Sequence, residues 1–106
     1  MNQTQIEKCK KILEYYGRNT QTLKLIEEMS ELAVEIIKIK IRPFGSQLSE
    51  EQIHHFWEEM ADVLIVLEQL IQCDGEKARK YIRRMITYKL DRQLERIKNG
   101  VNTGNQ

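Results

Sequence analysis

Apolar residues recur every three or four positions along most of the chain, and no stretch alternates between apolar and polar as a strand does. Segment 4–16 carries the first such pattern, and Gly17 follows it. Its apolar positions share one helical face: Ile6, Cys9, Ile12, Leu13 and Tyr16. The spacing therefore predicts a helix over residues 4–16 that ends at Gly17.

Turn-forming residues divide the rest of the chain into further helices. Asn19 or Thr20 is expected to cap a second helix, which continues to about residue 41. The sequence Arg-Pro-Phe-Gly-Ser at 42–46 opposes helical continuation, because proline and glycine both disfavour it. We therefore predict a loop there.

A third helix is predicted after this loop, because Ser49 and Gln52 have the spacing of a capping box. Its apolar pattern continues to about residue 73, where Asp74-Gly75 interrupts it. A fourth helix is expected beyond this interruption, ending at about residue 98.

The second and third predicted helices are apolar over more than one stripe. A helix that is apolar nearly all round is covered by neighbours, here including a second copy of the chain. The sequence thus predicts an all-α fold: a helical bundle of about four helices with a central antiparallel hairpin, completed by oligomerisation. Residues 1–98 are expected to form a single domain, and residues 99–106 a flexible C-terminal tail.

Composition adds limits to this picture. The chain has 106 residues, of which 31% are charged and 41% hydrophobic, as in small globular domains. A net charge of +1 gives no reason to expect binding to a nucleic acid polymer. The longest apolar run, 63–67, is too short to cross a bilayer, and no signal peptide is visible. We expect a cytoplasmic protein in which Cys9 and Cys73 are reduced thiols.

Two acid pairs stand in the most apolar segments: Glu28 with Glu31, and Glu59 with Asp62. Residues three apart in a helix share a face. Glu31 lies ten residues before the expected end of the second helix, and Glu59 nine residues after the start of the third. Both pairs therefore lie about 14–15 Å from the turn. An antiparallel hairpin brings them to the same level.

Four carboxylates at one level repel one another, and burial would make them take up protons unless positive charge arrived. No lysine or arginine lies within 25–37 or 52–74, so the compensating charge is not expected to be local. A hard divalent cation fits, Mg²⁺ by default and Mn²⁺ in its place. A di-iron centre would need Glu-x-x-His, which neither pair has. The other side chains nearby are interpreted as solvated acids (Glu27, Glu35, Glu58, Glu68) and as one packed and one exposed imidazole (His54, His55).

Charge is strongly segregated along the chain. Residues 27–68 contain ten acidic and three basic side chains, whereas residues 76–98 contain nine basic and three acidic ones. Salt bridges between the two regions are one interpretation. A ligand with several negative charges and a metal ion is another, because arginine and lysine neutralise phosphate oxygens. A third is nucleic-acid contact, which the acidic block would oppose.

The pattern Glu27-Glu28-x-x-Glu31 followed by Glu59-x-x-Asp62 resembles the EExxE…ExxD signature of MazG-like nucleotide pyrophosphohydrolases, a branch of the all-α NTP pyrophosphatases. The resemblance covers about residues 23–97. It implies a Mg²⁺-dependent enzyme that cleaves a nucleoside triphosphate, as NTP or dNTP, to the monophosphate and pyrophosphate. Dimers or tetramers are common in that family.

The resemblance also implies residue roles. The metal ligands would be Glu28, Glu31, Glu59 and Asp62. Glu27 would be a further ligand through water or would orient the attacking water, and is the expected catalytic residue. The expected substrate-binding residues are Lys89 and Arg92, which would meet the phosphates. Two alternatives remain: a non-catalytic helical module that binds a nucleotide or a protein, and a plain dimerising scaffold.

Overall fold

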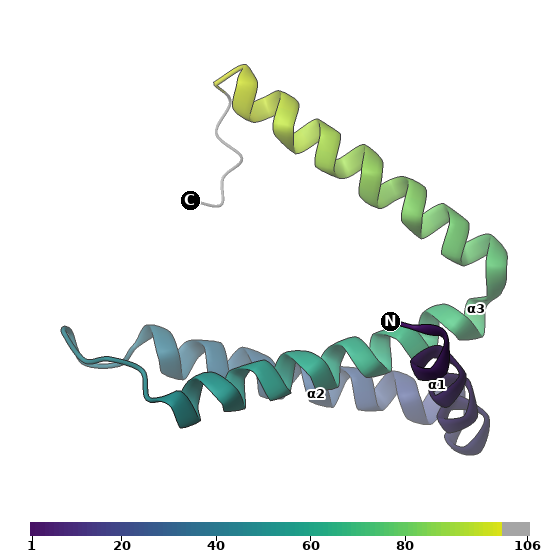
Figure 1. Cartoon of the computed structure of the whole chain (residues 1–106), viewed down its shortest axis with the longest axis horizontal. Helices are drawn as coiled ribbons and strands as arrows, with labels where there is room; N and C mark the ends of the chain where they lie inside the picture. Colours follow the sequence, from purple (N-terminus) through teal and green to yellow (C-terminus); the bar gives the residue numbers. More distant parts are fainter. Residues whose placement is uncertain (101–106) are drawn as a thin grey trace. The chain divides into compact units, whose positions relative to one another are not determined.

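The computed structural model describes residues 1–100, which are helical apart from short connections and contain no strand (Figure 1). It has three helices in the order α1 (Gln3–Tyr16), α2 (Arg18–Lys40) and α3 (Glu50–Lys98). The all-α prediction is confirmed. The expected third and fourth helices form the single element α3, in which only Gly75 has a non-helical backbone.

Gly17 joins α1 to α2 without a loop. Its φ of 86° and ψ of 162° end α1 and begin α2 in one residue, and no side chain caps α2. The predicted caps Asn19 and Thr20 are wrong, because both residues lie inside α2. At the other end of α1, Asn2 and Gln5 form a capping box that satisfies backbone N–H groups of the first turn.

The connection between α2 and α3 follows the prediction closely. Residues 41–49 form the loop around Pro43. The last turn of α2 carries Lys38 and Lys40, whose positive charges interact favourably with the negative end of the helix dipole. Ser49 Oγ accepts from Gln52 N at 3.1 Å, and Gln52 Oε1 accepts from Ser49 N at 2.9 Å. This predicted capping box is confirmed.

The chain divides just before Gly75 into two compact units, Met1–Cys73 and Asp74–Gln106. Gly75 has φ 87° and ψ −174°, a conformation essentially restricted to glycine. The second unit, as far as the structure describes it, is the rest of α3 followed by a turn at 99–100. The single domain over 1–98 stays a prediction, and the tail expected at 99–106 lies outside the described residues beyond Gly100.

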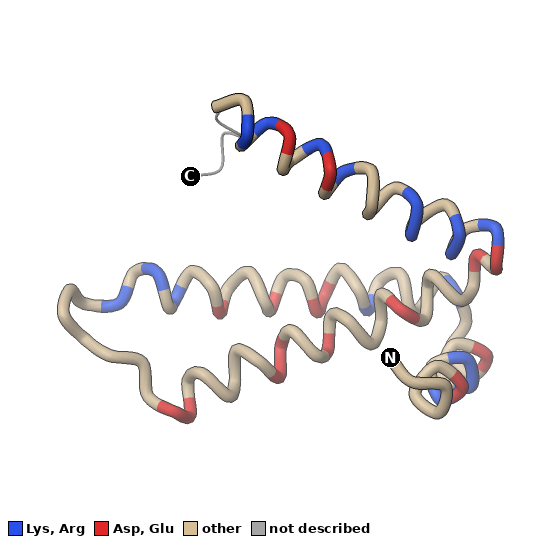
Figure 2. The backbone as a smooth tube through the Cα atoms, turned by 45° about the horizontal axis from the view of Figure 1, so that its top comes forward, with Lys and Arg blue, Asp and Glu red and all other residues tan. Residues whose placement is uncertain are grey.

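In the first unit, α2 and the part of α3 before Gly75 lie side by side and antiparallel, with α1 across their end away from the loop (Figures 1 and 2). Gln21 Nε2 donates to Gln69 Oε1 between α2 and α3. The Cys9 thiol of α1 lies 3.9 Å from the Ile65 carbonyl of α3. The predicted central hairpin is thus present within this unit.

The seam of this unit is unusually polar. Among the described residues, the buried apolar residues are Cys9 and Val66, which are 4% and 5% exposed. The buried polar residues outnumber them: Gln21, Glu28, Glu35 and Gln69. The buried polar groups of the hairpin are therefore the chemically distinctive part of the fold. No helix among the described residues is both long enough and apolar enough to cross a membrane.

Candidate metal centre and the adjoining groove

Three of the four predicted metal ligands meet at the middle of the hairpin. Glu28 of α2 and Glu59 and Asp62 of α3 each offer a carboxylate oxygen, and these oxygens lie within 4.8 Å of one another. Glu59 and Asp62 share a face because they are three residues apart in a helix. The antiparallel packing of α2 brings Glu28 to the same level. The arrangement is a cluster of oxygen ligands drawn from two helices.

Two oxygens of this cluster are buried without a partner. Only 8% of the Glu28 side chain and 13% of the Glu59 side chain are exposed, whereas Asp62 lies at the surface. Oε2 of Glu28 and Oε2 of Glu59 make no hydrogen bond with the described residues. A buried polar atom without a hydrogen bond costs about 1–3 kcal/mol, and more when charged. These two atoms therefore mark the place where a cation would be most stabilising.

A lysine one turn away compensates part of the charge. Lys24 Nζ lies 2.9 Å from Glu28 Oε1 and 3.4 Å from Glu27 Oε1. The hydrogen bond to Glu28 and the charges of Glu28 and Glu27 raise the Lys24 pKa. The expectation that no compensating charge is local is therefore wrong. Lys24 precedes the segment without cations by a single residue, and the i,i+4 spacing on a helix brings it to Glu28.

A histidine occupies the other side of the cluster. His55 Nε2 lies 3.4 Å from Glu35 Oε2 and 3.5 Å from Glu59 Oε1. The residue Glu35 is only 7% exposed, so the interpretation of Glu35 as solvated is wrong. Both His54 and His55 are exposed, so neither imidazole is packed in the way the sequence suggested. His55 Nε2 instead lies between carboxylates from the two helices, within ion-pair distance of each.

Glu31 lies beside the cluster rather than in it. Its carboxylate is exposed and is not among the three groups whose oxygens converge. Partial desolvation and then the carboxylates of Glu28 and Glu59 raise the Glu31 pKa. With Glu35, Glu59 and others, Glu31 lines a shallow cavity of about 280 Å³ on this side of the hairpin. The Glu31 carboxylate therefore interacts electrostatically with the cluster but is not one of the three carboxylates that form it.

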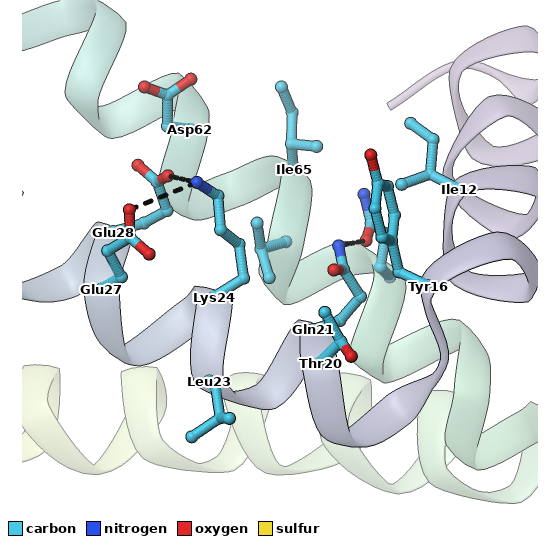
Figure 3. A pocket seen from close by; sticks show the side chains of 12 residues that line it. Ile12, Tyr16, Thr20, Gln21, Leu23, Lys24, Glu27, Glu28, Asp62 and Ile65 are labelled. Atoms are coloured by element: carbon cyan, nitrogen blue, oxygen red, sulfur yellow. Dashed lines mark hydrogen bonds and ion pairs between the residues drawn. The ribbon is translucent and has the colours of Figure 1, made fainter.

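A larger groove runs from the acids toward α1 (Figure 3). Its volume is about 570 Å³, within the range of small-molecule sites. Lys24, Glu27, Glu28 and Asp62 stand at one end, and the remaining lining residues continue from there: Ile12, Tyr16, Thr20, Gln21, Leu23, Ile65, Val66 and Gln69. The predicted catalytic residue Glu27 has a side chain that is 58% exposed. The Glu27 carboxylate is therefore accessible both to solvent and to a ligand in the groove.

The two predicted phosphate-binding residues belong to the second unit. Lys89 and Arg92 are exposed and lie three residues apart on α3, hence on one face. The Arg92 guanidinium lies 5.7 Å from the ring centre of Tyr88, and Arg84 lies 5.4 Å from that of Tyr81. These contacts hold two guanidinium groups over aromatic rings. The binding of phosphates by Lys89 and Arg92 stays a prediction.

Sequence reasoning missed four residues of this region. Lys24 and His55 had a usable signal, because each stands four residues before an acid of the cluster, Glu28 and Glu59 respectively. Gln21 and Gln69 had none, because a glutamine on a helix is usually solvated and only packing reveals that these two are buried.

Comparison with known proteins adds no further constraint: no family model, no curated protein and no solved structure matches this chain. The similarity of its acid pattern to the MazG-like signature is therefore a resemblance of motif, and the function has to be argued from the site.

Proposed function

We propose that the protein is a Mg²⁺-dependent nucleoside triphosphate pyrophosphohydrolase of the MazG-like type, which hydrolyses an NTP or dNTP to the monophosphate and pyrophosphate. The observation that carries the proposal is the convergence of Glu28, Glu59 and Asp62, with two buried carboxylate oxygens that no described residue satisfies. A scaffold without a ligand gains nothing from this arrangement, because the orphaned oxygens destabilise it.

The donor set fits a hard divalent cation. Carboxylate oxygens are the ligands that Mg²⁺ and Mn²⁺ prefer, and Mg²⁺ commonly takes one or two protein carboxylates together with substrate phosphates and water. Glu28, Glu59 and Asp62 would hold the ion, and the exposed Glu31 would reach it through water. A metal ion held there would polarise a phosphoryl oxygen and offset charge that develops in the transition state.

The chain's own side chains would complete the site. Glu27, exposed at the groove and beside Glu28, is the proposed orienting base for the attacking water. Lys24 neutralises Glu28 and Glu27, and the same ammonium is placed to neutralise a phosphate oxygen at the acid end of the groove. Lys89 and Arg92 are proposed to bind the phosphates and to stabilise the leaving pyrophosphate.

The test of the activity is pyrophosphate release from a panel of NTPs and dNTPs with Mg²⁺. We expect Glu59→Gln and Asp62→Asn to lower kcat/KM by at least about 100-fold, because each removes a carboxylate proposed to hold the metal ion that stabilises the transition state. Glu58→Gln is the matched control, since Glu58 is exposed and outside the cluster, and it should retain wild-type activity. Equal activity in all four proteins would remove the cluster from the mechanism.

Metal binding can be tested without turnover. A cation that binds only the folded state raises the melting temperature by mass action. We expect Mg²⁺ to raise the melting temperature of the wild type and of Glu58→Gln, but not of Asp62→Asn.

Nucleotide binding without hydrolysis across the panel would instead favour the alternative function, a non-catalytic helical module. The many exposed apolar side chains also suit such a module, because they can bind a partner.

A further inference from the structure

We propose that the end of the groove farthest from the acids is a nucleobase subsite, in which the amides of Gln21 and Gln69 bind the edge of the base. This inference rests on the proposed function for the phosphate end only. The subsite itself is argued from the groove, the buried amide pair and the spacing between the two ends.

The amide pair is the first support. Gln21 and Gln69 are 5% and 1% exposed, and Gln21 Nε2 donates to Gln69 Oε1. A primary amide offers two donors and one carbonyl acceptor. The bond between the two side chains uses one donor and one acceptor, and the Gln21 carbonyl and the other N–H groups can each bond to a further partner. Two apolar residues would fill the same seam without the desolvation cost, which points to a polar ligand as the reason for the pair.

The register of the two helices is the second support. Gln21 lies seven residues before Glu28 on α2, and Gln69 lies seven residues after Asp62 on α3. Seven residues correspond to about 10.5 Å along a helix, and the two helices are antiparallel. The amides are therefore level with each other and stand two turns from the carboxylates, along one groove (Figure 3). A nucleoside phosphate can span this separation, with its base at one end and its phosphate at the other.

The walls of the groove suit a flat heterocycle. Ile12, Ile65 and Val66 provide apolar surface beside the amides, and the Tyr16 ring stands at the same end (Figure 3). Base rings stack on aromatic side chains whatever their identity, whereas amide groups read the pattern of donors and acceptors on the edge. The subsite thus takes an uncharged heteroaromatic ring whose edge carries both a donor and an acceptor.

The experiment uses nucleosides as probes, without phosphate and without metal. In the wild-type protein, adenosine, guanosine, cytidine, uridine and thymidine at millimolar concentration are titrated while the side-chain amide resonances of Gln21 and Gln69 are followed. We expect at least one nucleoside to shift both resonances and ribose alone to shift neither. If no nucleoside shifts them, the subsite is rejected.

Substitution then separates base reading from packing. Replacing both partners of a buried hydrogen bond by apolar groups of similar shape can be nearly neutral for stability, so the double variant Gln21→Met/Gln69→Met is expected to fold. Its affinity for the preferred nucleoside should fall about tenfold, as expected for losing one or two hydrogen bonds. The control is Gln47→Met/Gln93→Met, because both residues are exposed, and it should bind as the wild type does.

The outcomes distinguish this inference from the proposed function. Hydrolysis that is indifferent to the base and unchanged in the double variant would reject the subsite and leave the hydrolase intact. Nucleoside binding without hydrolysis of any triphosphate would retain the subsite and reject the hydrolase. If the double variant fails to fold, the amide shifts of the wild-type protein still decide the question. Tyr16→Ala is then the second variant, and an undiminished nucleoside affinity of Tyr16→Ala would contradict stacking of the base on Tyr16.

Discussion

At the scale of single residues, environment separates carboxylates that the sequence presents as equivalent. Glu28 and Glu31 stand on one helix face, yet Glu28 is buried against α3 and Glu31 is exposed beside it. Lys24 pairs with Glu28 and Glu27, so part of the negative charge is already balanced. Glu31 has no such ion pair among the described residues, and its pKa is raised by partial desolvation and then by the charges of Glu28 and Glu59.

Glu31→Gln should raise the melting temperature near neutral pH in the absence of divalent cations. Because the Glu31 pKa lies above its ordinary value of 4.5, the folded state disfavours the ionised form. The contribution of Glu31 to stability is therefore largest below the ordinary pKa and is lost as pH rises through the raised one. The gain from removing the charge should shrink as pH falls toward about 4.

The measurement is a series of thermal melts between about pH 4 and pH 7 with a chelator present. Glu58→Gln is again the control, since it removes the same charge from an exposed position outside the cluster. A gain that is equal in both variants at every pH would show that net charge alone, and not the carboxylates around Glu31, is responsible.

At the scale of helices, local chemistry sets most of the boundaries. The capping box at Ser49 and Gln52 starts α3, and the break around Pro43 ends α2, as predicted. The two other boundaries depend on glycine. Gly17 and Gly75 both combine a φ near 87° with an extended ψ, a combination that side chains strongly disfavour. Gly17 sets where α1 turns into α2, and Gly75 interrupts the helical backbone of α3 just after the end of the first unit.

Gly17→Ala should lower the free energy of unfolding by about 1–3 kcal/mol, because alanine must adopt that disfavoured conformation. A β-carbon at this position would meet nothing within 4 Å, so the cost comes from the backbone and not from a clash. Chemical denaturation measures the change. A synthetic chain with D-alanine at position 17 is the control, since the mirror-image residue accepts this conformation, and it should keep wild-type stability. A loss of stability with D-alanine would refute the backbone explanation.

At the scale of the whole molecule, the apolar surface exceeds what a solitary chain is expected to show. Ile26, Met29 and Leu64 are each more than half exposed, although they belong to the helices of the central hairpin. Many exposed large apolar side chains on a small protein favour an interface. We therefore propose a homo-oligomer, a dimer or a tetramer, that covers these side chains.

Association of this kind makes stability depend on protein concentration. We expect the wild type to sediment as an oligomer and its melting temperature to rise with concentration. Ile26→Glu/Leu64→Glu should shift the protein toward the monomer, because the interface would then bury charge. The control is Glu50→Gln/Glu51→Gln, at the exposed start of α3. A monomer at every concentration, with a constant melting temperature, would contradict the proposal.

Much of the fold followed from the sequence because its determinants are local. Helical spacing, Gly17, the Ser49 capping box and the break at Gly75 act within a few residues of themselves, so periodicity and turn chemistry reveal them. The level at which the acid pairs meet also followed, since helix rise converts a residue count into a length. Glu28, Glu59 and Asp62 were found in this way.

Only the tertiary structure decided which polar groups are buried. A glutamate or glutamine looks the same in the sequence whether it faces water or the facing helix, and its cost depends on the neighbours that packing supplies. Packing buried Glu35 under His55, left Glu31 outside the cluster, and joined Gln21 to Gln69 across the hairpin. The sequence by itself determined the helices and the height of the acids along them, whereas contacts between residues far apart in the chain determined the site.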